Sequence, residues 1–143
     1  MKKFYFLIIC TILILPTNNI LAQENATNED EIIEACLTFQ PLMEKIPSPV
    51  KEQITEYFIL NQEGFLNFSQ NLKINGKVVS LIGKAQLDQV KLYFDFFTLN
   101  IENNKADVLY YTSYKVDNNT HTISTTIQFE KNNSVWEIIN YSF

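Results

Sequence analysis

The chain has 143 residues and a formal charge of −5, and 46% of its residues are hydrophobic and 13% aromatic. All eleven basic residues are lysine, so the chain lacks the guanidinium fork that grips phosphates and guanine, and we expect no nucleic-acid binding. The length predicts one domain, and the apolar fraction predicts a packed core rather than a disordered chain.

The N-terminal segment predicts a secretory signal. Lys2 and Lys3 precede an apolar stretch over residues 4–15, which is shorter than the roughly 20 residues that cross a bilayer. A polar stretch and then Ala22 follow, which is the pattern of a signal cleaved after Ala22. An uncleaved membrane anchor is the alternative, and cleavage would leave no membrane segment.

Removal of residues 1–22 would leave residues 23–143 as a single domain with 9 basic and 16 acidic residues, hence a charge of 9 − 16 = −7. Cys36 is then the only cysteine, so no internal disulfide can form. Its apolar neighbours predict a buried structural thiol. We expect export to the periplasm or the exterior, and the abundance of Asn, Ile and Lys favours an AT-rich bacterial genome.

Two helices are predicted ahead of the sheet. Asn28 and Glu31 have the spacing of a capping box, and the helix they begin should end or kink near Gln40, because Pro41 follows. A second helix is expected to start at Ser48 and to continue up to Gly64. The apolar stripes of the two helices are Ile32, Cys36, Phe39, Met43 and Ile46, and then Val50, Ile54, Tyr57 and Phe58.

Beyond Gly64 the apolar period changes to two, which predicts strands. Asn75-Gly76 is a strong hairpin signal that pairs Leu72 with Val79 and Gln70 with Leu81. A short helix over residues 84–90 follows. Four strands are then expected over residues 91–102, 106–116, 121–130 and 135–142, with turns at 103–104, 117–120 and 132–133. The resulting α+β fold has N-terminal helices on a strongly curved antiparallel sheet, in the order α-α-β-β-α-β-β-β-β.

These turns set a strand register that predicts one continuous apolar face. One row of that face is polar, because the register aligns Asp95, Thr112, Thr125 and Asn140. The predicted neighbours are Leu99 with Val108, Phe97 with Tyr110, Asp95 with Thr112, Val116 with His121, Tyr110 with Ile127, Val108 with Phe129, Phe129 with Trp136, Ile127 with Ile138, and Thr125 with Asn140.

The polar row suggests a pocket in which Asp95 is the general base or the polar anchor. The alternative is a structural polar belt within the core. Its candidate residues are Tyr93, Asp95, Tyr110, Thr112, Tyr114, Thr125 and Asn140.

The opposite face of the sheet carries an apolar patch that is a candidate interface. Its residues are Phe94, Phe96, Leu109 and Tyr111. The alternative is that the first hairpin, around Phe68 and Leu72, covers it.

The element order resembles the nuclear transport factor 2-like superfamily. Two further features are similar to that family: Gly83 before the short helix, and a turn followed by the Trp136-Glu137-Ile138 strand. The family's Gly-Asp step after the first helix is absent, and Pro41 and Pro47 occupy that region. The resemblance implies a cone-shaped pocket, and members of the superfamily include isomerases, dehydratases, ligand carriers and interaction modules.

The expected function is that of an exported, noncatalytic binding or interaction module. A small hydrophobic ligand or a protein would be its partner, and a homodimer is one such arrangement. The alternatives are a cofactor-free isomerase or lyase with Asp95 as base, and an envelope inhibitor or immunity-type protein. One histidine, His121, and one remaining cysteine predict no metal site, and no cofactor is expected.

Overall fold

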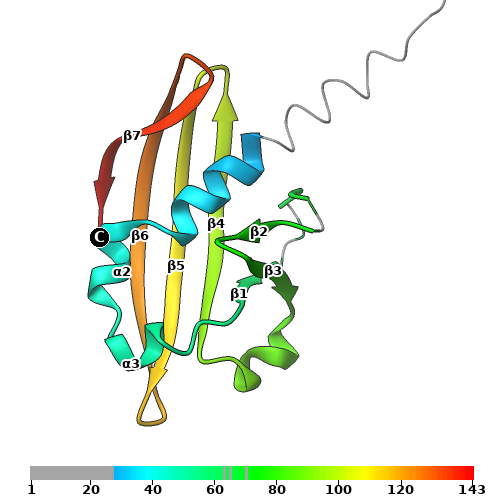
Figure 1. Ribbon diagram of the computed structural model, residues 1–143, viewed down its shortest axis with the longest axis vertical. Helices are drawn as coiled ribbons and strands as arrows, with labels where there is room; N and C mark the ends of the chain where they lie inside the picture. The colour runs from blue at the N-terminus through cyan, green and yellow to red at the C-terminus, as the bar shows by residue number, and fades with distance from the viewer. Residues whose placement is uncertain (1–27, 63, 65, 70) are drawn as a thin grey trace, which may run out of the picture.

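The computed structural model of the chain describes residues 28–62, 64, 66–69 and 71–143 (Figure 1). The predicted signal segment and Gln70 of the first hairpin lie outside these residues. The fold is α+β, with one seven-stranded mixed sheet in the order β2-β3-β1-β4-β5-β6-β7. Among the residues that are described, no helix is long and apolar enough to cross a membrane.

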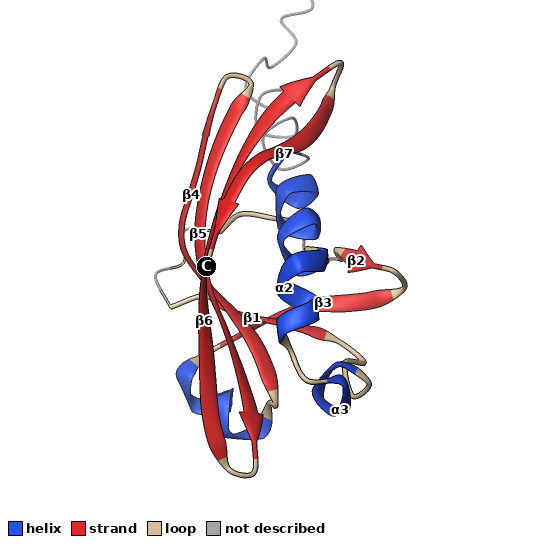
Figure 2. Ribbon diagram, turned by 90° about the vertical axis from the view of Figure 1, so that its left-hand side faces the viewer, coloured by secondary structure: helices blue, strands red, loops and turns tan. Residues whose placement is uncertain are grey.

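Three helical segments lie on one face of the sheet (Figure 2): residues 28–37, α2 (Gln40–Lys45) and α3 (Ser48–Lys51). The predicted break near Pro41 is confirmed, because the first helix ends at residue 37 and Pro41 lies in the first turn of α2. Asn28 is itself helical rather than a cap, and its Oδ1 accepts a hydrogen bond of 2.6 Å from Lys131 Nζ.

The prediction of a long second helix is wrong. α3 ends at Lys51, and the segment Tyr57–Leu60 forms strand β1 instead. β1 lies in the middle of the sheet and runs parallel to both neighbours, so the all-antiparallel prediction is also wrong. A short, continuous apolar run is the pattern of a strand that is covered on both faces, and helical spacing within it is coincidental.

The first hairpin is confirmed. β2 (Lys73–Ile74) and β3 (Lys77–Ile82) flank Asn75-Gly76, whose φ angles are both positive, at 51° and 79°. The Val79 N–H donates to the Leu72 carbonyl at 3.0 Å, as the predicted pairing requires. The 3-10 helix η1 (Lys84–Gln89) follows, close to the expected short helix.

The four long strands are confirmed as β4 (Leu92–Glu102), β5 (Lys105–Val116), β6 (Asn119–Asn132) and β7 (Val135–Ser142). The turn at residues 103–104 is also as predicted. The other two turns differ: the second consists of residues 117–118 alone, and the third of residues 133–134. All four of these turn residues have positive φ, and two-residue turns form. Three of the four, Asp117, Asn118 and Asn133, are residue types that tolerate positive φ better than most.

The shorter second turn changes the predicted register between β5 and β6 by two residues. Tyr110 faces Thr125 rather than Ile127, Val108 faces Ile127 rather than Phe129, and Val116 faces Asn119 rather than His121. Because side chains alternate with a period of two, this shift leaves each residue on its predicted face.

A β-bulge in β4 has a larger effect. Leu99 faces Val108 as predicted, but the register shifts between Phe96 and Thr98, so that Phe96 faces Tyr110. Phe97 is the extra residue, and one extra residue reverses the faces of the strand that precedes it. Asp95 accordingly faces Tyr111 instead of Thr112.

A second bulge lies in β7. Phe129 faces Ile138 instead of Trp136, and beyond the bulge Gln128 faces Asn140 and Ile127 faces Tyr141. Asn140 therefore has no pairing with Thr125, contrary to the predicted register.

The main core lies between the helices and one face of the sheet, which we call the inner face. Buried side chains that build it from the strands include Phe94, Phe96, Val108, Tyr110, Ile127 and Phe129. On the opposite, outer face, a smaller cluster of Leu60, Ile82 and Val90 lies between η1 and the central strands.

Candidate functional site

The structure divides the predicted pocket between the two faces of the sheet. Tyr110, Thr112, Tyr114 and Thr125 lie on the inner face, and Tyr93, Asp95 and Asn140 lie on the outer face. The predicted grouping is therefore wrong. Its physical cause is the pair of bulges, each of which reverses the side-chain alternation of its strand.

The inner-face polar groups are embedded in the core. The Tyr110 hydroxyl is buried and donates to the Cys36 carbonyl at 3.1 Å. Burial raises the pKa of the Tyr110 phenol and also that of the Cys36 thiol, so both groups are neutral at physiological pH. The prediction that Cys36 is buried is confirmed.

Thr112 and Thr125 are fully buried, and neither hydroxyl has a hydrogen-bond partner among the described residues. Further along this face, Tyr114 stacks on the exposed His121, with ring centroids 5.4 Å apart. The inner-face residues thus match the predicted alternative of a polar belt in the core more closely than they match a pocket with a carboxylate.

Asp95 lies on the outer face, half-buried and paired with Tyr111. Desolvation raises the pKa of its carboxyl group, and the charge of Lys84 opposes that shift. Folding therefore favours the neutral form of this acid relative to the unfolded chain, and this contribution to stability is lost as the pH rises through the folded-state pKa.

We expect Asp95→Asn to be at least as stable as the wild type at about pH 7 and to lose less stability between about pH 4 and about pH 7. Urea unfolding at the two pH values measures this. Asp88→Asn, which changes a fully exposed carboxylate, is the matched control. Lower stability of Asp95→Asn at neutral pH would mean that the carboxylate makes a favourable interaction.

A polar ladder crosses the outer face rather than the inner one. Gln128 donates to Asp107 Oδ1 at 2.9 Å, and Asn140 donates to Gln128 Oε1 at 3.1 Å. Cross-strand side-chain bonds of this kind stabilise a solvent-facing sheet. Asn140 thus has a structural role at the outer surface.

Two of the four residues predicted to form the interface patch do not lie on the outer face. Phe94 and Phe96 are buried in the main core, whereas Leu109 and Tyr111 lie half-buried on the outer face. The bulge turns Phe97 outward, where its side chain is 66% exposed and its ring contacts Tyr111 edge-on at 6.3 Å. We call Phe97, Leu109 and Tyr111 the Phe97 patch.

The first hairpin does not cover this patch. Phe68 and Leu72 pack against the main core, so the predicted alternative is wrong. A sequence signal for the patch did exist. Apolar residues occupy positions 92, 94 and 96 and then 99 and 101, and this change from even to odd positions marks the extra residue.

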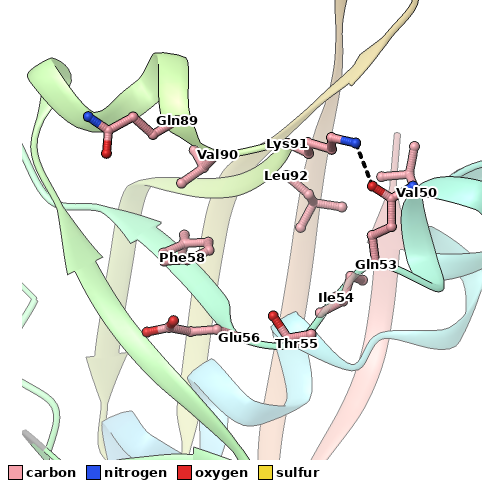
Figure 3. Close-up of a pocket in the computed structure, with 10 residues that line it drawn as sticks. All are labelled: Val50, Gln53, Ile54, Thr55, Glu56, Phe58, Gln89, Val90, Lys91 and Leu92. Carbon is pink, nitrogen blue, oxygen red and sulfur yellow. Dashed lines mark hydrogen bonds between the residues drawn. The ribbon is translucent and has the colours of Figure 1, made fainter.

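A small pocket lies between the segment that follows α3 and the start of β4 (Figure 3). Its volume is about 180 Å³, which is below the roughly 300 Å³ at which ligand pockets begin. None of the predicted site residues lines it. Its wall is held in place by Lys91, whose Nζ donates to Gln53 Oε1 at 2.6 Å.

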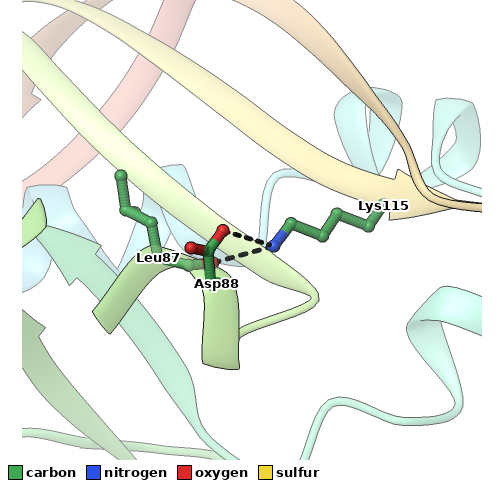
Figure 4. Close-up of polar contacts among 3 residues, drawn as sticks. All are labelled: Leu87, Asp88 and Lys115. Atoms are coloured by element: carbon green, nitrogen blue, oxygen red, sulfur yellow. Dashed lines mark hydrogen bonds and ion pairs between the residues drawn. The ribbon is translucent and has the colours of Figure 1, made fainter. Parts of the chain in front are cut away.

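Near that pocket, Lys115 connects β5 to η1 (Figure 4). Its Nζ donates to the Leu87 carbonyl at 3.0 Å and lies 3.7 Å from Asp88 Oδ1. Because Asp88 is fully exposed, the ion pair adds little stability, and the bond to the carbonyl is the stronger connection.

Comparison of the chain with protein-family models, with curated proteins and with solved structures yields no match.

Proposed function

We propose that this chain is an exported, noncatalytic interaction module that binds a protein partner at the Phe97 patch. The observation that carries this proposal is the bulge in β4, which places a large aromatic side chain on a sheet face with 66% of it exposed. Bulges re-aim side chains at functional sites, and exposed apolar patches on sheets are favoured contact surfaces.

The charges around the patch indicate the chemical character of a surface that would bind to it. Asp95 pairs directly with Tyr111, and Asp107 lies two residues from Leu109 on the same face. Lys84 lies close enough to Asp95 for its charge to lower the pKa of that carboxyl group, but β4 itself contains no lysine and the chain as a whole is acidic. A complementary surface is apolar at its centre and carries lysine or arginine at its rim.

The nuclear transport factor 2-like assignment remains part of this proposal. Helices packed on one sheet face and four long antiparallel strands support it. The isomerase alternative required Asp95 to lie on the inner face, and we do not propose it.

Site-specific photocrosslinking in the producing cells tests the patch. A photoreactive phenylalanine analogue at Phe97 should yield one discrete adduct, because this side chain would lie inside the contact. The same analogue at Val78, which is 42% exposed on β3, is the control and should yield none. Excess wild-type protein should compete the adduct away, and Phe97→Ser should fail to compete.

Two results would overturn the proposal. One is the absence of any adduct specific to position 97. The other is equal competition by Phe97→Ser and wild type, which would place the contact elsewhere. An adduct of twice the chain's own mass would make the patch a self-contact and would contradict a separate partner.

A further inference from the structure

The two edges of the sheet differ in the protection they have against pairing with another strand. At one edge, β2 is two residues long, begins with Lys73 and pairs with Lys77 at the start of β3. At the other, β7 runs over eight residues, contains no lysine, and has Glu137 as its only charged residue. Short edges and lysines are how proteins block edge-to-edge pairing, so the β7 edge lacks the protection that the β2 edge has.

The exposed apolar side chains of the described chain are concentrated on β7. Five of the eight large exposed ones belong to this strand and the residue after it. They are Val135, Ile138, Ile139, Tyr141 and Phe143. An edge that combines unpaired backbone groups with apolar side chains is a surface for a further strand.

The backbone direction along β7 follows from its turn. Asn132 and Val135 close a two-residue turn, and such a closing pair is hydrogen-bonded. Bonded and non-bonded pairs alternate along an antiparallel ladder, so Trp136 and Ile138 direct their N–H and C=O groups away from β6. No other strand among the described residues pairs with these groups.

We propose that the occupant of this edge is β7 of a second copy of the chain, antiparallel and centred on Ile138. A two-fold axis perpendicular to an antiparallel sheet places the central residue opposite its own copy. Ile138 satisfies this condition, because its outward N–H and C=O can exchange two hydrogen bonds with those of its copy. Centring on Glu137 would instead place two carboxylates together.

The strand is self-complementary in this register. If the bulge residue Ile139 is skipped, as it is in the pairing with β6, Trp136 faces Tyr141 of the second copy. Both are inner-face side chains, and aromatic pairs stabilise cross-strand contacts. On the outer face, Glu137 faces Asn140 of the second copy, so that the only charged side chain of β7 lies opposite an amide.

Sedimentation equilibrium of the purified exported chain tests the dimer. We expect the wild type to form a reversible dimer. For Ile138→Lys we expect the dissociation constant of the dimer to be at least about thirtyfold higher, because two ammonium groups would meet at the axis. Val78→Lys is the matched control: Val78 is 42% exposed and Ile138 38%, and the control should dimerise as the wild type does. Thermal melts establish that each variant folds.

The register has its own test. Ile138→Glu alone should also be monomeric, and an equimolar mixture of Ile138→Glu and Ile138→Lys should form a heterodimer, because position 138 faces itself. A wild-type monomer, a dimer that survives Ile138→Lys, or a failure of the two variants to complement would each overturn the proposal. The Phe97 proposal is tested separately, because Phe97→Ser should leave the dimer unchanged.

Discussion

Phe96→Ala is expected to lower the free energy of unfolding by about 3–5 kcal/mol, and Phe97→Ala to change it by about 0.5 kcal/mol or less. The two residues are chemically identical neighbours in one strand. Phe96 is 3% exposed and stacks on Tyr110 with ring centroids 5.2 Å apart, whereas Phe97 is 66% exposed. The contrast in stability thus follows from the bulge alone.

This pair of substitutions distinguishes the observed register from regular alternation. Without the bulge, Phe97 would face Tyr110 in the core and Phe96 would be exposed, so the two costs would be reversed. Urea unfolding of the two variants beside the wild type measures the difference. Equal costs, or a larger cost at Phe97, would contradict the bulge and with it the Phe97 patch.

Thr112→Val should raise the free energy of unfolding by about 1 kcal/mol, which corresponds to roughly 3–6 °C in melting temperature. The hydroxyl of Thr112 is fully buried and has no hydrogen-bond partner among the described residues. An unsatisfied buried hydroxyl costs stability, and valine fills nearly the same volume without that cost.

Thr126→Val is the control for this prediction, because Thr126 lies on the solvent-facing side of β6. It should change the melting temperature little. A fall in stability for Thr112→Val would contradict the prediction, and it would mean that a buried water molecule bonds to the hydroxyl.

The two proposed surfaces are compatible with each other. The Phe97 patch lies on β4 and β5, and the dimer edge is β7, with β6 between them. A two-fold axis perpendicular to the joined sheet would leave both outer faces on the same side. The dimer would then present two Phe97 patches to one partner surface, and two linked contacts bind more tightly than one.

Much of the fold can be read from the sequence because its signals are local. The four long strands, the hairpin at Asn75-Gly76 and the helix break near Pro41 depend on residues that favour particular backbone angles. The prediction of a long second helix also depended on a local pattern, and it was wrong. Tyr57–Leu60 has an apolar pattern that suits either structure, and only its two parallel neighbours select the strand.

The candidate site could not be read so directly, because a face of a sheet depends on every residue between the turn and the position in question. One extra residue at Phe97 moved Asp95 to the outer face and Phe96 into the core. The change of apolar parity near that residue is present in the sequence. Strand lengths and turn residues alone, however, do not distinguish an extra residue within a strand from an extra residue in the turn beside it.

The sequence by itself determined the α+β composition, the four strands of the C-terminal half, and the burial of Cys36. Each of these depends on local backbone preference or on apolar character. Only the tertiary structure decided which side chains share a surface. Side chains alternate between the two faces along a strand, so one extra residue reverses the face of every position beyond it. The bulges in β4 and β7 therefore separated the predicted pocket residues, and the bulge in β4 exposed Phe97.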